Sequence, residues 1–154
     1  RNSTATAFIH RDKAWILTDL AQNSKILRNQ VKPSLEQSGV KQVTYLDIHK
    51  PFSTPTLQLR EHQVHFANFK LLIADTCLNG KTPGNNLYVD VINVSHYSNW
   101  DIDGLLQQCK ARRVIIDNRN SALQAQRIEK QADNNNLPVY NLKIKKAYLV
   151  NLTK

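Results

Sequence analysis

The chain has 154 residues, with 21 lysine and arginine residues against 12 aspartate and glutamate residues, and a formal net charge of +9 at pH 7. The length favours one domain, and the absence of a stretch of about 18 apolar residues, or of an apolar run behind a basic start, excludes a transmembrane helix and a signal peptide within these residues. The positive charge favours nucleic acid or an anionic membrane surface as a partner, although a basic surface without a specific ligand explains it equally well.

The chain starts at Arg1 and contains no methionine. We therefore expect residues 1–154 to be a single soluble domain taken from a longer protein. A membrane anchor and further functions would then lie in the parent chain.

Alternating polar and apolar residues predict a β-hairpin at the start of the chain, followed by a helix. The helix is expected from Asn23 onwards, and Ser24 is its expected N-cap. Pro33 should kink or split this helix, and Gly39 should end it. The strands expected in this half cover residues 4–10, 13–19, 42–48, 57–66 and 69–75, with a loop at 50–56 and a turn near Asn68.

A loop over residues 78–86, rich in glycine and asparagine, separates the two halves of the chain. Asp101 and Ser121 are expected to cap helices that run to about residues 109 and 132. The strands expected in this half cover residues 88–94, 113–117, 137–140 and 146–150. Because strands and helices alternate, the pattern predicts a layered α/β fold with helices packed on the sheet faces.

No self-contained catalytic or metal-binding motif is present in the sequence. The five histidines form no HxH, HxxxH or HExxH pair. His62 and His65 fall on opposite faces of the strand predicted at 57–66, so they are not expected to share a metal. The phosphate-cradling loops GxxxxGK[ST] and GxGxxG and the nucleophile elbow GxSxG are also missing. Cys77 and Cys109 have no CxxC partner and are interpreted as buried free thiols.

Chemically useful side chains stand at the ends of four predicted strands. Each of these apolar strand segments ends in one of four residues, Asp19, His49, Asp75 or His96. In layered α/β folds such strand ends converge on one sheet edge, where sites are built. Taken singly, each of the four is more often an ordinary strand terminator, so they are informative only as a set.

The order of these segments resembles the metallo-β-lactamase-like domain at the C-terminus of ComEC, the inner-membrane channel of natural transformation. The resemblance is carried by LTD, GVKQVTYLDIH, LLIADT and VDVINVSHYSN, and towards the end of the chain by RRVIID, LPVYNL and KKAYLVNL. Shortened versions of the Bacteroidetes type are the most similar. The resemblance implies a trimmed metallo-β-lactamase sandwich, with mixed sheets and helices on the outer faces. It also implies attachment to the inner membrane through the parent chain, on a side that the sequence leaves open.

The metal-binding signature of the resembled family is broken in this chain. HxHxDH would begin at His49, where the chain reads HKPFST, and HYSN stands at His96 where active members have His-His-Gly-Ser. A two-metal hydrolase needs about four to six nitrogen and carboxylate ligands. The resemblance therefore implies a vestigial metal site at Asp19, His49, Asp75 and His96, without catalytic residues and without a cofactor. A single weakly bound zinc or manganese ion stays open.

The resemblance implies a pseudo-enzyme beside a DNA-uptake channel, with the transmembrane part of the same chain as partner and single-stranded DNA as a second candidate partner. The residues proposed for DNA contact are Tyr97, Trp100, Lys110, Arg112, Arg113, Lys143, Lys145 and Lys146. Trp100 also fits a hydrophobic staple against the helix capped by Asp101. Two alternative functions are a weakly metal-dependent nuclease or phosphodiesterase, and a structural or regulatory domain without nucleic acid contact. The oligomeric state stays open.

Overall fold

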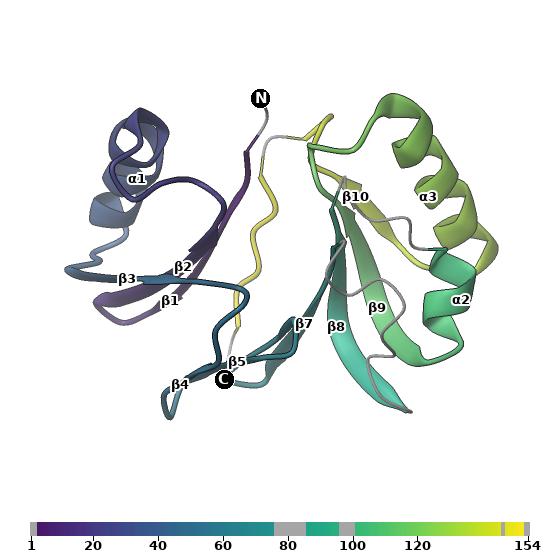
Figure 1. Ribbon diagram of the computed structural model, residues 1–154, viewed down its shortest axis with the longest axis horizontal. Helices are drawn as coiled ribbons and strands as arrows, with labels where there is room; N and C mark the ends of the chain where they lie inside the picture. Colours follow the sequence, from purple (N-terminus) through teal and green to yellow (C-terminus); the bar gives the residue numbers. More distant parts are fainter. Residues whose placement is uncertain (1–2, 76–85, 96–100, 146, 153–154) are drawn as a thin grey trace.

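Two β-sheets face each other, and helices cover their outer faces (Figure 1). The computed structural model describes residues 3–75, 86–95, 101–145 and 147–152. One sheet has three strands and the other has seven. This architecture is the α/β sandwich with mixed sheets and outer helices that the sequence predicts.

The three-stranded sheet is built from the first part of the chain, in the order β1-β2-β3. β1 (Ala5–His10) and β2 (Lys13–Thr18) form the predicted antiparallel hairpin. β3 (Gln42–Leu46) pairs with β2 in parallel. A parallel pair needs a crossover connection, which the helical segment between β2 and β3 supplies.

The helical segment consists of a π-helical turn, η1 (Leu27–Val31), and the helix α1 (Lys32–Gln37). The Lys32 N–H donates to the Leu27 carbonyl, a five-residue step that widens the helix immediately before Pro33. Proline has no N–H to donate, and its ring would collide with the preceding turn of a regular helix. The helix is therefore not split at Pro33: the chain stays helical from residue 25 to residue 37, and the π turn accommodates the proline.

The seven-stranded sheet has the order β10-β9-β8-β7-β6-β5-β4. Its strands are β4 (Phe52–Ser53), β5 (Leu57–Arg60), β6 (Gln63–Phe66), β7 (Phe69–Ala74), β8 (Leu87–Val94), β9 (Cys109–Ile116) and β10 (Val139–Asn141). β4 to β7 pair as an antiparallel meander, whereas β7 to β10 are parallel. α2 (Ile102–Leu106) and α3 (Ala122–Asn134) connect parallel strands and cover the face turned away from the small sheet (Figure 1).

The helix boundaries follow the predicted capping residues. Ser24 and Asp101 each accept a backbone N–H at the start of their helical segments, and Ser121 forms a reciprocal capping box with Gln124. Gly39 follows α1 with a φ of +79°, a left-handed conformation that glycine adopts without steric cost. These local signals therefore fix where the helical segments begin and where α1 ends.

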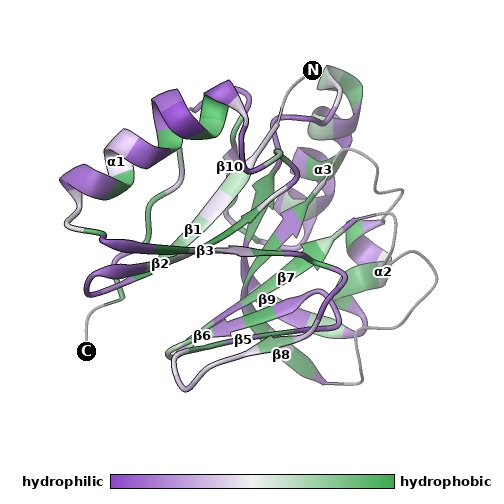
Figure 2. Ribbon diagram, turned by 60° about the vertical axis from the view of Figure 1, so that its left-hand side comes forward, coloured by the Kyte–Doolittle hydropathy of each residue, from purple (hydrophilic) through white to green (hydrophobic). Residues whose placement is uncertain are grey.

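Apolar side chains fill the spaces between the layers. Between the two sheets, the rings of Phe8 and Trp15 lie with their centroids 5.4 and 6.2 Å from that of Phe66. The other buried residues of this inter-sheet core are Leu17, Leu46, Leu57, Leu59, Val64, Leu71, Val91 and Ile115. Separate clusters fill the space under α1 (Ala14, Ile16, Leu35, Val40) and the space under α2 and α3 (among them Leu72, Ile92, Leu105, Val114, Ile128). Figure 2 shows the corresponding concentration of hydrophobic residues in strands such as β7 and β8.

The strand predicted at 57–66 is in fact a hairpin. β5 and β6 are separated by a two-residue turn at Glu61 and His62, which have φ values of 51° and 65°. Buried positions are odd-numbered before the turn, as at Leu59, and even-numbered after it, as at Val64. This change of phase is the signal of the turn that the prediction missed, because a continuous strand keeps its alternation.

Three further boundaries differ from the prediction. The helix expected to reach residue 109 ends at Leu106, because Cys109 and Ala111 already pack as strand residues against the helix-side core. The loop expected at 50–56 contains the short strand β4, which pairs with β5. No strand forms at 147–150 among the described residues, because this segment contacts the sheet through a side chain and not through a backbone ladder.

Candidate functional site

The carboxyl ends of the four parallel strands form a row, which we call the strand-end edge. It consists of Asp75, Ser95, Asp117 and Leu142, which directly follow β7, β8, β9 and β10. Backbone hydrogen bonds of 3.0 Å from Ser95, Asp117 and Leu142 to the neighbouring strand continue the sheet ladder into this row. The edge is therefore a rigid support for side chains, and sites in folds of this kind are built at such ends.

Asp19, which follows β2 of the small sheet, is paired with Arg119 of the large sheet. Arg119 Nη1 lies 3.0 Å from Asp19 Oδ2. The same guanidinium donates to Asp117, from Nη2 to Oδ2 at 2.8 Å and from Nε to Oδ1 at 3.0 Å, and Thr4 also donates to Asp117 Oδ2, at 3.2 Å. Arg119 thus bridges the two sheets and occupies the first carboxylate of the predicted ligand set.

The charge of Arg119 is secured by its two carboxylate partners. Burial disfavours the charged guanidinium, but hydrogen bonding and Coulomb attraction to Asp117 and Asp19 outweigh burial and raise the pKa of Arg119 above its ordinary value. Arginine is in any case protonated throughout the physiological range. The strand-end edge therefore contains a permanent cation supplied by the protein itself.

A second contact at this edge joins Asp75 to His62. His62 Nε2 lies 3.1 Å from Asp75 Oδ1, and the two side chains are 14% and 20% exposed. The atoms are within hydrogen-bonding distance, but Nε2 does not make a directed hydrogen bond, so the contact is an ion pair when His62 is protonated. The ring of His49 stands edge-on to that of His62, with 6.3 Å between their centroids. The structure thus brings His49 and Asp75 together through His62, for which the sequence analysis predicted only that it does not share a metal with His65.

The three predicted ligands within the described residues, Asp19, His49 and Asp75, are divided between these two contacts. Among the described residues, no group of three or more histidine, cysteine, aspartate or glutamate side chains is placed to hold a metal ion. His96 lies outside the described residues, as do Tyr97, Trp100 and Lys146. The interpretation of Asp19, His49, Asp75 and His96 as vestigial metal-site residues accordingly stays a prediction.

Basic and aromatic side chains gather along β8, β9 and β10 of the large sheet, on the face opposite α2 and α3, and Lys145 lies at the edge of the sheet beside β10. We call this set the basic aromatic strip: Tyr88, Lys110, Arg112, Arg113, Tyr140, Lys145 and Tyr148. Arg112 Cζ lies 5.5 Å from the ring centroid of Tyr88, and Arg113 Cζ lies 5.4 Å from that of Tyr148. The rings of Tyr148 and Tyr140 are 4.9 Å apart and edge-on, and Lys145 Nζ lies 5.0 Å from the Tyr140 centroid. These spacings are those of cation–π and edge-to-face contacts.

Lys143 makes its contacts outside the basic aromatic strip. Its ammonium is 3.5 Å from the carbonyl oxygen of Asn120, and its backbone N–H donates to Asn141 Oδ1 at 2.9 Å. Both partners adjoin the strand-end edge. Of the predicted DNA-contact residues within the described range, the structure thus groups Lys110, Arg112, Arg113 and Lys145 and separates Lys143.

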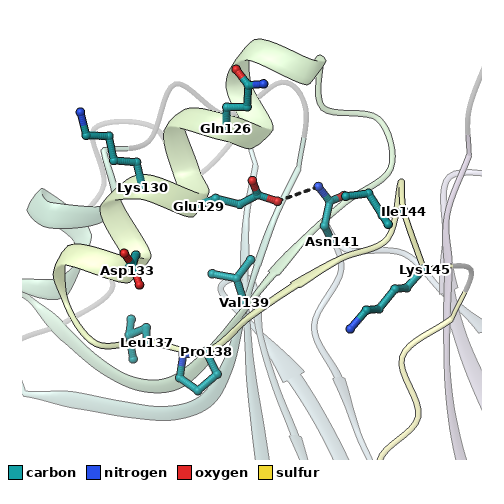
Figure 3. A pocket seen from close by; sticks show the side chains of 10 residues that line it. All are labelled: Gln126, Glu129, Lys130, Asp133, Leu137, Pro138, Val139, Asn141, Ile144 and Lys145. Atoms are coloured by element: carbon teal, nitrogen blue, oxygen red, sulfur yellow. Dashed lines mark hydrogen bonds between the residues drawn. The ribbon is translucent and has the colours of Figure 1, made fainter.

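A groove with a volume of about 730 Å³ lies between α3 and β10 (Figure 3). Glu129 of α3 accepts a hydrogen bond of 3.0 Å from the Asn141 side chain across its upper end. Its walls carry both signs of charge, from Glu129 and Asp133 and from Lys130 and Lys145. Such a mixture provides no net field for an anionic ligand.

Cys109 is the cysteine within the described residues, and it is a buried free thiol, as predicted. Desolvation by burial raises the pKa of Cys109 to about 11. Because the thiolate is the reactive form, Cys109 is not a nucleophile at neutral pH. Cys77 lies outside the described residues.

Residues 1–152 match the sequence model of a family described as the ComEC C-terminal domain. The chain belongs to the ComEC C-terminal domain family. No curated protein and no solved structure matches the chain. Membership of the ComEC family connects the chain with DNA uptake in competence and with a membrane-associated parent protein. None of the helices in the described part of this ComEC domain has the length and apolar character needed to cross a membrane.

Sequence reasoning missed several residues of these sites, among them Arg119, Asp117 and Tyr88. Arg119 and Asp117 were not singled out, although Asp117 ends the strand segment RRVIID as Asp75 ends LLIAD. Tyr88 was not singled out because its position beside Lys110 depends on the register of β8 and β9. The local signal available for Asp117 and Arg119 was a carboxylate at the end of a strand with an arginine two residues after it.

Proposed function

We propose that this chain is a non-catalytic domain of a ComEC-type DNA-uptake protein. Its role is to contact single-stranded DNA, or the channel part of its own parent chain, during natural transformation. The proposal combines the family match with the broken HxHxDH signature at His49. It assigns no hydrolytic step to the domain.

The observation that carries the proposal is the position of Arg119. Its guanidinium lies against Asp19 and Asp117, where a hydrolase would need free carboxylates to ligate a cation. A resident positive charge repels a metal ion and already satisfies the acceptors that such an ion requires. The protein cation thus stands in for a metal in neutralising this edge, and it provides no bound water to activate.

Calorimetric titration of the chain with zinc and with manganese tests this proposal. We expect no tight binding, because two of the predicted ligand positions are separated into arginine-paired and histidine-paired contacts. Sub-micromolar binding at two sites, weakened by His49→Ala and by Asp75→Asn, would overturn it. Arg127→Gln on α3, an exposed position, is the matched control for unspecific changes in charge.

One observation favours the nuclease alternative. The Asp75–His62 contact, with His49 beside it, has the residue types of a weak metal site or of a carboxylate-oriented base. Degradation of single-stranded DNA in the presence of manganese tests this alternative, with His62→Ala as the variant that removes the contact. If the wild-type chain cleaved the DNA no faster than a His96→Ala control, the nuclease alternative would be without support.

A further inference from the structure

Part of the inner face of the large sheet is not covered by the small sheet. Val91 and Ile115 are buried in the inter-sheet core, whereas Tyr88 is 40% exposed and Lys110 and Arg112 are exposed. These three residues precede the buried positions along β8 and β9. The sheet therefore extends beyond the core, and its uncovered end carries two cations and a ring.

A shift in the strand alternation puts two consecutive arginines on this face. Ala111 and Val114 both pack in the helix-side core, three residues apart, so Arg112 and Arg113 between them both turn to the opposite face. β8 has the matching shift between Val89 and Ile92. The result is a continuous row in which each arginine lies over its own tyrosine.

We infer that the basic aromatic strip binds single-stranded DNA, with an unpaired base stacked at Tyr88 and the adjoining phosphates held by Lys110 and Arg112. Arg113 and Tyr148 extend the path along the sheet. This inference deepens the proposed DNA contact and rests on it. Base–aromatic stacking needs unpaired bases, and an exposed tyrosine on a strand beside cations is the arrangement that sheet-based single-strand binders use.

The local charge supports this assignment after one acidic group is taken into account. Asp90 is the residue between Tyr88 and Val91 that reduces the positive potential, and its Oδ2 accepts the Lys70 N–H at 2.8 Å. Its carboxylate is thereby partly satisfied by the backbone of β7. Lys110, Arg112 and Arg113 still leave a net positive charge for phosphate contacts.

The strip is distinct from the strand-end edge. Lys110 and Asp117 are seven residues apart along β9, a separation of roughly 23 Å at about 3.3 Å per residue. Substitutions at Tyr88, Lys110 and Arg112 are therefore expected to leave the contacts of Arg119, His62 and Asp75 intact. DNA binding and metal binding can accordingly be tested separately.

Fluorescence anisotropy of labelled oligothymidine with the 154-residue chain tests the inference. Tyr88→Ala is expected to weaken binding about five- to one-hundred-fold through lost stacking, whereas Tyr88→Trp keeps a ring and restores it. Lys110→Gln and Arg112→Gln should each lower the slope of log affinity against log salt by about 0.7, measured from about 50 to about 200 mM salt. Arg127→Gln, an exposed arginine on α3, is the matched control and should leave the affinity unchanged within about two-fold.

Each outcome separates the inference from the broader proposal. Binding that Tyr88→Ala and Arg112→Gln leave unchanged would overturn the strip as the site, while DNA contact elsewhere on the chain would stand. An absence of binding to oligothymidine at low salt would overturn the inference and the DNA contact together, without affecting the metal titration. Binding to phosphatidylglycerol vesicles that depends on Tyr88, with no binding to oligothymidine, would identify a lipid surface and overturn the inference. Thermal melting of each variant confirms that the fold is intact, which is expected because Tyr88, Lys110 and Arg112 are exposed.

Discussion

A single arginine joins the two sheets at the strand-end edge, and its two partners contribute unequally. Asp117 is fully buried, so its charge needs a partner inside the protein. The Asp19 side chain is 39% exposed, so water screens its contact with Arg119. The stabilising effect of Arg119 therefore comes mainly from its pair with Asp117. Its contact with Asp19 mainly occupies a carboxylate that was predicted as a metal ligand.

Replacing Arg119 by methionine is expected to destabilise the fold by about 3 kcal/mol, because Asp117 is left buried without its counter-charge. Unfolding in urea measures the change in the free energy of unfolding. Arg127→Met removes an exposed arginine from α3 and is expected to stay within about 0.5 kcal/mol of the wild type. If the two variants were equally stable, the buried charge of Asp117 would not depend on the guanidinium of Arg119.

At the level of elements, the turn between β5 and β6 has backbone strain, because its two residues adopt left-handed conformations that their side chains disfavour. Glu61 and His62 have the positive φ values of a two-residue hairpin turn, positions that asparagine and glycine occupy at lower cost. Glu61→Asn should therefore raise the free energy of unfolding by about 0.5–1 kcal/mol. Urea unfolding checks this, with Gln58→Asn in the regular part of β5 as the control that brings no gain. A loss of stability in Glu61→Asn would mean that a contact of the Glu61 side chain stabilises the fold by more than the relief of backbone strain does.

Elements specified by local signals could be predicted from the sequence. The first hairpin and the helix α3 follow from alternation and from the Ser121 cap, which act within a few residues. The turn at Glu61 was missed because its signal is a change of phase between two short strands. The early start of β9 at Cys109 was missed because basic residues interrupt the apolar pattern, and only packing against the helices shows which positions are buried.

The candidate sites were predictable only where the residue type alone was informative. Lys110, Arg112 and Arg113 were proposed as DNA-contact residues from their charge, and the structure places Arg112 and Arg113 against tyrosine rings. The Arg119–Asp19 contact joins residues 100 positions apart in the sequence, so no local pattern encodes it. Partner choice at that distance is set by how the two sheets pack.

For the whole molecule, the packing between the sheets determines whether these sites act together. The inter-sheet core is centred on Phe66, whose ring contacts Phe8 and Trp15 from the small sheet. The strand-end edge draws its partners from both sheets, through Arg119 and Asp19. Loss of the inter-sheet core should therefore also separate the edge, whereas the strip lies mainly on the large sheet and its C-terminal segment.

We expect Phe66→Ala to lower the free energy of unfolding by about 3–5 kcal/mol and to do so for the whole chain at once. In a Trp100→Phe background, Trp15 fluorescence follows the small sheet, while far-UV circular dichroism includes the signal of α3 on the large sheet. Both transitions should shift together, because one shared core makes the two sheets a single cooperative unit. Leu123→Ala, at a residue 77% exposed on α3, should shift neither. A shift of the Trp15 transition alone would mean that the two sheets unfold independently. The contacts at the strand-end edge would then not depend on the packing between the sheets.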